Sequence, residues 1–119
     1  HAPFCGKAMA VEHDGSVFSC DHFVYPEYLL GNIAQTHEGD MAYSDRQRRF
    51  GFAKRDTLPR YCRDCEHLRH CWGECPKNRL VRTPDGEAGL NYLCGGWKAF
   101  YAHAGRDMPE VVRRMNMPA

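Results

Sequence analysis

The 119-residue sequence contains no apolar run that approaches the ~20 residues needed to span a bilayer, and no signal-peptide pattern. Its net charge is only +1, which gives no electrostatic reason to expect nucleic acid or an anionic membrane as a partner. It also lacks internal repeats and low-complexity segments, and its 11 glycines and 7 prolines are spread along the chain. We therefore expect one small domain with a modest core, and neither a membrane protein nor a nucleic-acid-binding one.

Five of the 16 lysines and arginines form a local basic cluster in one short segment. A solvated helix face is the simpler interpretation of this segment, and a docking surface for a partner domain is the alternative. The basic residues are Arg46, Arg48, Arg49, Lys54 and Arg55.

Cysteine, in contrast, is abundant and clustered. The stretch CRDCEHLRHCWGECPK spans residues 62–77 and holds four of the seven cysteines. An odd number of cysteines leaves one thiol unpaired in any disulfide framework. Metal ligation by reduced thiolates fits this clustering better, and reduced thiols indicate a cytoplasmic protein.

Local patterns predict an α+β fold, in which an N-terminal β-hairpin is followed by short helices around metal or cluster sites. Asp14-Gly15 lies between two β-type runs, which is a strong hairpin signal. The outer ends of such a hairpin meet, so Cys5 and Cys20 can approach each other. Further on, Ser44 is a predicted N-cap for a helix to about Lys54, although Gly51 weakens that prediction.

The remaining segments are predicted to be irregular or broken. We expect a loop over 21–33, a connector over 34–43 and a turn over 83–89. Apolar spacings of three and four predict a helix from about residue 90 to 101 that is interrupted at Gly95-Gly96. A separate last helix would start near Asp107, with three residues facing inward: Val111, Val112 and Met115.

The number of cysteines fixes how many sites the chain can complete. A tetrahedral zinc site or a cubane iron–sulfur cluster takes about four protein ligands, so seven cysteines make one complete site and one that lacks a ligand. Zinc ribbons usually show two Cys-x-x-Cys knuckles, and this chain has only Cys62-x-x-Cys65. In two-cluster bacterial ferredoxins a compact run ends in Cys-Pro, and its last cysteine ligates the other cluster. Cys75-Pro76 closes the run here in the same way.

That analogy divides the cysteines into two groups, which we call the first set and the second set. The first set is Cys62, Cys65, Cys71 and Cys94, and the second set is Cys5, Cys20 and Cys75. The fourth ligand of the second set would lie upstream of His1, be a solvent or substrate atom, or come from a histidine such as His1 or His22.

Two histidines lie inside the cysteine run itself. His67 and His70 could donate hydrogen bonds to cluster sulfurs, although surface exposure is the simpler role for both.

The complete cysteine pattern resembles the signature of the SPASM domain, the C-terminal extension of many radical SAM enzymes. It reads Cys5-x9-Gly15-x4-Cys20, then Cys62-x2-Cys65-x5-Cys71-x3-Cys75, then Cys94. The resemblance covers about residues 5–103. It implies that residues 1–119 form a single C-terminal SPASM-like domain, detached from the radical SAM barrel.

Within that group the chain resembles the anaerobic sulfatase-maturating enzymes, some of which are also described as arylsulfatase regulators. The resembling stretches are CDHFV at 20–24, YPEY at 25–28, LGNI at 30–33, Leu58-Pro59, CPK at 75–77 and GLNYLC at 89–94. The resemblance implies a parent oxidoreductase that converts a cysteine or serine of an unfolded sulfatase segment into Cα-formylglycine.

The resemblance also implies the cofactors. Two auxiliary 4Fe–4S clusters would be bound, one by the first set and one by the second set together with a cysteine upstream of His1. Zinc could replace iron in a fragment made in air, because soft sulfur sites accept both metals. S-adenosylmethionine would bind only in the absent domain, since this chain has no Cys-x3-Cys-x2-Cys motif and is expected to be inactive alone.

Asp21, directly after Cys20, matches the acidic residue that is implicated in deprotonating the target side chain in that family. A carboxylate beside a cluster and screened from water is expected to have a raised pKa and to act as a base. Without the resemblance, a turn-forming aspartate is the simpler interpretation.

Two other functions fit the same residues. The chain could be the SPASM domain of another peptide-modifying radical SAM enzyme, or a structural zinc-binding or regulatory module.

Overall fold

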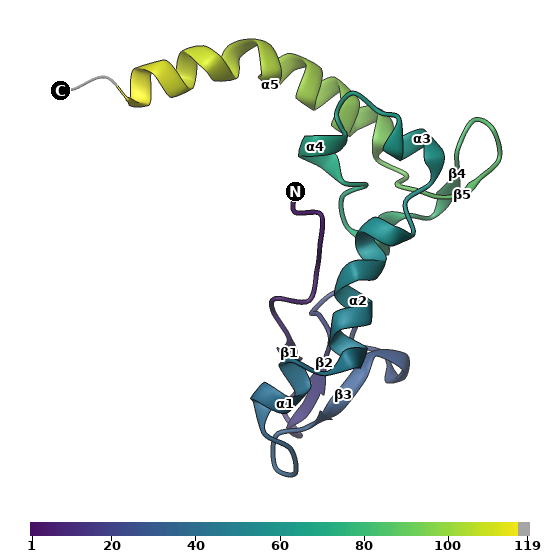
Figure 1. Ribbon diagram of the computed structural model, residues 1–119, viewed down its shortest axis with the longest axis vertical. Helices are drawn as coiled ribbons and strands as arrows, with labels where there is room; N and C mark the ends of the chain where they lie inside the picture. Colours follow the sequence, from purple (N-terminus) through teal and green to yellow (C-terminus); the bar gives the residue numbers. More distant parts are fainter. Residues whose placement is uncertain (117–119) are drawn as a thin grey trace.

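Two small antiparallel sheets and a series of mostly short helices make up the computed structural model, which describes residues 1–116 (Figure 1). This arrangement confirms the predicted α+β class. The last three residues of the predicted domain, 117–119, lie outside the described residues. The elements are β1 (Ala10–Val11), β2 (Ser16–Phe18), β3 (Leu29–Asn32), α1 (Glu38–Ala42), α2 (Asp45–Asp56), α3 (Arg60–Arg63), α4 (Leu68–Cys71), β4 (Val81–Arg82), β5 (Ala88–Leu90) and α5 (Cys94–Met115), with 3₁₀ turns at Pro26–Tyr28 and Pro76–Asn78.

The first sheet contains the predicted hairpin and one strand that was not predicted. β1 pairs antiparallel with β2, and Gly15 in the turn between them has a φ of 84°. β3 then pairs with the other edge of β2, so the prediction of a loop throughout 21–33 was wrong. Pro26 stands at the start of a 3₁₀ turn, where its missing N–H costs nothing, and the chain returns beside β2 after it.

Two further segments contain more regular structure than predicted. In the predicted connector, His37 caps the one-turn helix α1 by accepting a hydrogen bond from the Gly39 N–H at 3.0 Å. The predicted turn at 83–89 contributes to a hairpin between β4 and β5. Both elements are too short for a periodic sequence pattern to reveal them.

The helix α5 is continuous over 22 residues, so the predicted break at Gly95-Gly96 and the separate last helix were wrong. The two glycines fall in its first turn. Pro109 is accommodated on an exposed stretch, where water can satisfy the carbonyl that loses its partner. The three apolar residues predicted to face inward, Val111, Val112 and Met115, are exposed.

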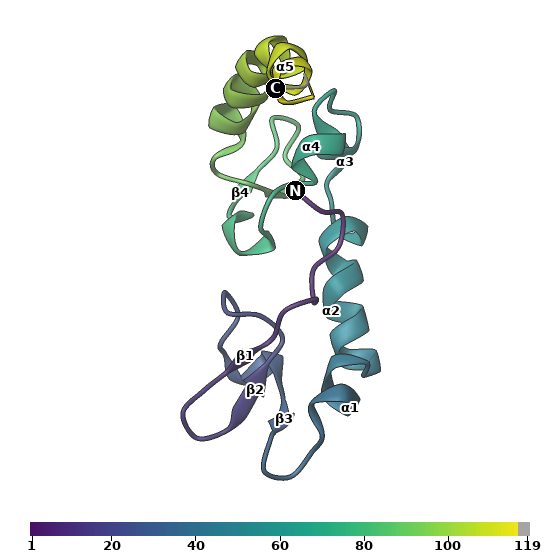
Figure 2. The ribbon, with the colours of Figure 1, turned by 90° about the vertical axis from the view of Figure 1, so that its left-hand side faces the viewer.

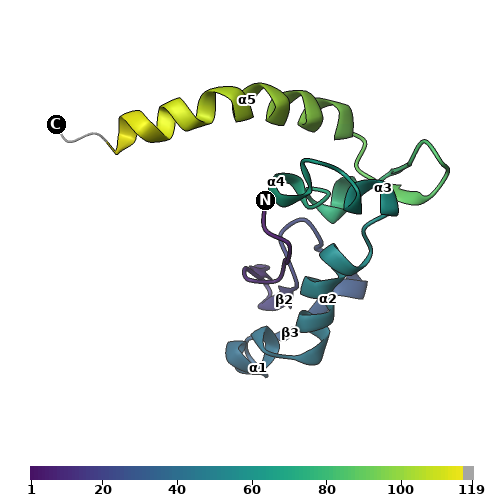
Figure 3. The same cartoon turned by 45° about the horizontal axis from the view of Figure 1, so that its top comes forward.

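The molecule is extended, with a radius of gyration of 17.8 Å, whereas about 14 Å is typical of a compact domain of this length. Figure 2 shows one part built from β1–β3, α1 and α2, and a second part built from α3, α4, the β4–β5 hairpin and α5. The N-terminus lies next to α4 (Figure 3), where the His1 amine donates to the carbonyl of His70 at 2.6 Å. Among the described residues the buried apolar side chains larger than alanine are few: Val17, Met41, Leu58, Pro59, Cys62 and Leu90. A core this small is typical of domains that need a metal for stability.

The helix α2 connects the two parts, and its buried face is polar. Ser44 is its N-cap as predicted, because the Ser44 hydroxyl accepts from the Gln47 N–H at 3.1 Å. Gln47, Gly51 and Lys54 are the buried residues of this helix. Since Lys54 is only 6% exposed, the prediction that it belongs to a solvated basic face was wrong, whereas the four arginines of that segment are exposed.

We expect Gly51→Ala to destabilise the protein, although a glycine-to-alanine change inside a helix normally stabilises by about 1 kcal/mol. A Cβ atom at position 51 would lie 2.7 Å from the Cys5 carbonyl oxygen. The resulting shift of the Cys5 segment should cost about 1–3 kcal/mol in urea unfolding. Gly105→Ala is the matched control, because nothing lies within 4 Å of its Cβ position, and it should stabilise. Equal changes in the free energy of unfolding of the two variants would show that Gly51 is not needed for this close contact.

Candidate metal centre

The four thiols of the first set converge where α3, α4 and α5 meet. Successive backbone turns place them, with the Cys65 N–H donating to the Cys62 carbonyl at 3.2 Å and the Leu68 N–H to the Cys65 carbonyl at 3.0 Å. Burial raises the pKa of the Cys62 thiol to about 11, and the neighbouring Cys94, Cys71 and Cys65 add to that rise. Burial also raises the pKa of Cys94, with Cys71 and Cys65 contributing. The structure thus brings together the four residues that sequence reasoning grouped.

The three thiols of the second set also converge. Burial raises the pKa of Cys5, and the charge of Cys75 raises it further. Burial likewise raises the pKa of Cys20, with a contribution from Cys5. The thiols of Cys5 and Cys20 are therefore near enough for their charges to interact, which agrees with the approach expected from the hairpin.

Polar contacts with α2 hold the second set in place. The Cys5 N–H donates to the Gly51 carbonyl at 3.1 Å. The buried amide of Gln47 donates to the carbonyls of Gly6 at 3.1 Å and Ser19 at 3.0 Å. These carbonyls belong to the residues next to Cys5 and Cys20, so a single side chain fixes both segments.

A short left-handed loop separates the two sets. Trp72, Gly73 and Glu74 all have positive φ, at 50°, 66° and 52°. Burial would raise the pKa of Glu74, but hydrogen bonds from the Asn78 and Asn91 side chains, each 2.8 Å long, and from the Cys75 backbone hold it below its usual value. The loop reverses the chain between Cys71 and Cys75, so two cysteines four residues apart belong to different sets.

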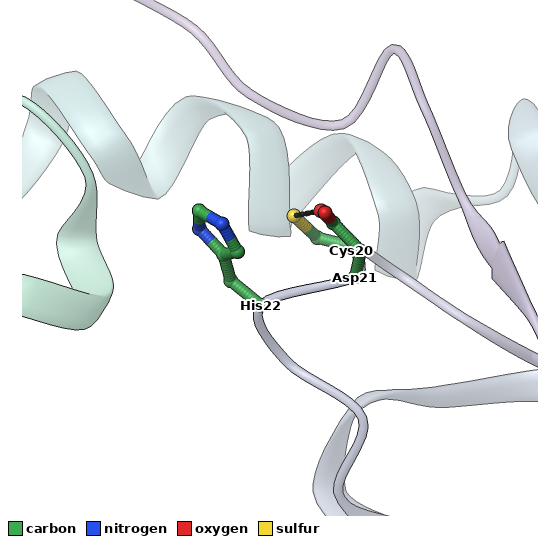
Figure 4. A group of neighbouring side chains, drawn as sticks. All are labelled: Cys20, Asp21 and His22. Carbon is green, nitrogen blue, oxygen red and sulfur yellow. Dashed lines mark hydrogen bonds between the residues drawn. The ribbon is translucent and has the colours of Figure 1, made fainter.

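Of the histidines considered as ligands, His22 lies beside the second set. Its Nδ1 is 3.1 Å from the Cys75 sulfur. The donor atoms of Cys20, Asp21 and His22 all lie within 4.8 Å of one another (Figure 4). His1 is elsewhere, since its ring packs edge-on against Trp97 with centroids 5.2 Å apart.

The two histidines of the cysteine run pack against one aromatic ring. His67 and His70 each lie 5.9 Å from the ring of Tyr101, measured between centroids. Hydrogen bonds from them to cluster sulfurs stay a prediction. His70 is exposed and His67 is half-buried.

Asp21 is exposed, and the Cys20 thiol donates a hydrogen bond to its Oδ1 at 3.1 Å. This hydrogen bond lowers the pKa of Asp21 in this chain. The rise expected beside a bound cluster in the intact enzyme stays a prediction. The rise required a carboxylate screened from water, and this side chain is open to solvent. The lowered pKa keeps Asp21 ionised at neutral pH, which is the form that accepts a proton.

Three cations that sequence reasoning did not place at the sites lie beside the thiols. Lys54 acts to lower the pKa of Cys5, and Lys98 acts to lower that of Cys94. Lys98 also donates to the Tyr61 hydroxyl at 2.7 Å, and that hydrogen bond raises the pKa of Lys98. The third cation, Arg79, is near both sets. The sequence offers no signal for them beyond an excess of charge, because their role depends on distant segments.

The donor atoms suit a thiolate-bound metal or cluster. All seven thiols are free in the structure, and their charges interact within one group of four and one group of three. The raised pKa values of Cys5, Cys20, Cys62 and Cys94 mean that a metal would displace protons on binding, which is the usual behaviour of thiolate sites. Soft sulfur donors with adjacent cations favour zinc or iron–sulfur clusters.

Comparison with known proteins identifies the family. Residues 5–66 match the SPASM family, which is described as an iron–sulfur cluster-binding domain. The chain belongs to the SPASM family. The range matched includes four of the seven cysteines: Cys5, Cys20, Cys62 and Cys65.

Sequence relatives of this SPASM domain are anaerobic sulfatase-maturating enzymes. A serine-type enzyme from Bacteroides thetaiotaomicron is 52% identical over 102 residues, which cover 86% of this chain and 25% of that enzyme. A cysteine-type enzyme from Clostridium perfringens is 29% identical over 100 residues, covering 84% and 26% respectively. The chain therefore spans about a quarter of the length of the curated relatives it matches.

Solved structures agree with this relationship. The structure described as native anSMEcpe with bound AdoMet and the Cp18Cys peptide has a TM-score of 0.78 and 27% identity, with 96% of this chain and 31% of that chain covered. A second structure, native anSMEcpe with bound AdoMet, has a TM-score of 0.77 and 28% identity over 97% and 30% of the two chains. Within residues 1–116, no helix has the length and apolar character required to cross a membrane.

Proposed function

We propose that this SPASM domain is the auxiliary iron–sulfur part of a radical SAM enzyme that oxidises a sulfatase cysteine or serine to Cα-formylglycine. The observation that carries the proposal is the convergence of the thiols into two sets, with Asp21 beside the second. Its partners would be the radical SAM barrel of the same enzyme and an unfolded sulfatase segment. The reduced thiols support a cytoplasmic location.

The cysteines have distinct roles in this proposal. The first set holds one 4Fe–4S cluster with four thiolates. The second set holds another with three thiolates and a fourth ligand, which we assign to a cysteine upstream of His1, as the family resemblance implies. His22 then donates a hydrogen bond to the Cys75 sulfur instead of ligating iron. Zinc on the same thiolates would be a substitute that arises when the protein is prepared in air.

The chemistry requires three losses from the target CH₂–XH group, where X is oxygen or sulfur, and these losses leave CH=X. When X is sulfur, water must then hydrolyse the thioaldehyde to the aldehyde, and the sulfur leaves as H₂S. One hydrogen atom goes to the deoxyadenosyl radical, which the barrel domain supplies. One proton goes from X–H to the carboxylate of Asp21, which is exposed and directly follows Cys20. One electron remains, and the bound clusters supply the acceptor for it. The domain's own residues therefore provide the base and the ligands.

The full-length protein that carries this chain, reconstituted anaerobically with iron and sulfide, tests the proposal. Incubation with S-adenosylmethionine, a reductant and a sulfatase-derived peptide containing serine or cysteine should yield formylglycine, detected by mass spectrometry. A brown protein that leaves both peptides unchanged would favour the SPASM domain of another peptide-modifying enzyme. A colourless protein with stoichiometric zinc after the same treatment would favour a structural module.

A further inference from the structure

Arg79 is the only side chain that hydrogen-bonds both to α2 and to the left-handed loop in the described part of the chain. Its guanidinium donates to the carbonyls of Lys54 at 2.8 Å and Trp72 at 3.0 Å, and more weakly to the Gly73 carbonyl at 3.4 Å. A further contact joins it to the Thr57 hydroxyl at 3.3 Å. Arg79 therefore ties the element that holds Cys5 to the loop that separates Cys71 from Cys75.

The same guanidinium contacts the loop that joins Cys71 of the first set to Cys75 of the second set. Burial lowers the pKa of Arg79, and thiolates of both sets oppose that change, namely Cys62 and Cys71 of the first set and Cys5 and Cys75 of the second. An arginine stays protonated in proteins, so the position carries a permanent positive charge. Carboxylates do not neutralise it directly, since its hydrogen-bond acceptors are carbonyls and one hydroxyl.

We propose that Arg79 is a positioning residue shared by both cluster sites, whose fork fixes the loop between them and whose charge raises the reduction potential of both clusters. Reduction adds one negative charge to a cluster, and a nearby cation stabilises the reduced form more than the oxidised one. The planar fork explains why an arginine is present, because it reaches several carbonyls in different directions at once, which a lysine ammonium on a single stem cannot do in the same geometry.

This inference rests on the assignment of two clusters but not on sulfatase maturation. Arg79 affects two separable properties, which are the stability of the left-handed loop and the reduction potentials of the two clusters. The hydrogen bonds to Trp72 and Gly73 stabilise a loop with two non-glycine residues of positive φ, which is costly on its own. The positive charge of Arg79 acts on the electron affinity of the two clusters. A substitution that keeps the charge but loses the fork should therefore affect only the first property.

The experiment uses the reconstituted full-length protein and measures iron content, thermal unfolding and the midpoint potentials of the clusters by redox titration with EPR detection. Arg79→Gln should lower the potential of both auxiliary clusters, so that the reduced fraction at a fixed potential falls several-fold for each. Arg79→Lys should keep both potentials near those of the unmodified protein while the unfolding temperature falls, as it does in Arg79→Gln. Arg82→Gln is the matched control, because it removes an exposed positive charge three residues away and should change neither property.

Unchanged potentials in Arg79→Gln, or a change in only one cluster, would overturn the proposal. If Arg79→Gln fails to retain iron, Arg79→Lys decides, since lowered potentials in that variant would contradict a role for the charge. The iron content of the unmodified protein is a separate result. Fewer than two auxiliary clusters there would refute the two-cluster assignment, whereas inactivity on sulfatase peptides with two intact clusters would refute only the proposed reaction.

Discussion

Cys75→Ala and Cys71→Ala should each remove one cluster, and not the same one. The two cysteines lie four residues apart, but the left-handed loop directs Cys71 to the first set and Cys75 to the second. Each single variant of the full-length protein should lose about four iron atoms per chain. The double variant Cys71→Ala/Cys75→Ala should lose about eight, because two different clusters have each lost a ligand.

The matched comparison is Cys5→Ala/Cys75→Ala, which combines residues 70 positions apart. Both belong to the second set, so this double variant should lose no more iron than Cys75→Ala alone. Iron and sulfide analysis after anaerobic reconstitution measures both results. The reverse pattern, with additive loss for Cys5 and Cys75 and no further loss for Cys71 and Cys75, would indicate a single four-thiol site in the run. In the same assay His22→Ala should retain full iron if His22 is a hydrogen-bond donor, and should lose a cluster if it is the fourth ligand.

The grouping of the cysteines could be predicted from sequence because it depends on counting and on local geometry. Asp14-Gly15 makes a hairpin, and a hairpin brings its flanking residues together. Cys75-Pro76 closes the run in the manner of a two-cluster ferredoxin. Neither inference required knowledge of how α2 packs. The N-cap at Ser44 was predictable for the same reason, since its hydrogen bond lies within one turn.

The environment of the sites could not be predicted, because distant segments create it. Gly51 looked like a weakness in a helix, but it permits close contact with the Cys5 backbone. Lys54 looked like part of a solvated charged face, but it is buried with its charge near Cys5. Amphipathic patterns describe helices that bury apolar side chains. The buried residues of α2 are Gln47, Gly51 and Lys54. Its inward face therefore shows no apolar pattern in the sequence.

The length of α5 illustrates a different limit. Gly95-Gly96 and Pro109 are helix-breaking signals, and a helix predicted from intrinsic preferences alone ends at each of them. The structure continues through both, because the glycines stand in the first turn and the proline on an exposed stretch. Intrinsic helix preferences of single residues are small compared with the free energy that a favourable position in the helix and contact with water can supply.

Asp21→Asn should lower formylglycine production by about 10²–10⁴-fold in the full-length enzyme while leaving its iron content unchanged. Asparagine has nearly the same shape, but it cannot take up the proton that the target hydroxyl or thiol loses. Asp21 is exposed and makes its one side-chain hydrogen bond with Cys20, so little folding energy depends on it. Product is measured by mass spectrometry of the target peptide, and iron by direct analysis.

The control for this variant is Asp64→Asn. Asp64 directly precedes Cys65 as Asp21 directly follows Cys20, and it is also exposed. Its ion pair with Arg60 is 3.2 Å long and open to solvent, so it contributes about 0–1 kcal/mol. We expect Asp64→Asn to keep both its iron and its activity. A small activity loss in Asp21→Asn would contradict the assignment of Asp21 as the base. Loss of iron with loss of activity would instead show that its carboxylate is needed to hold the Cys20 segment.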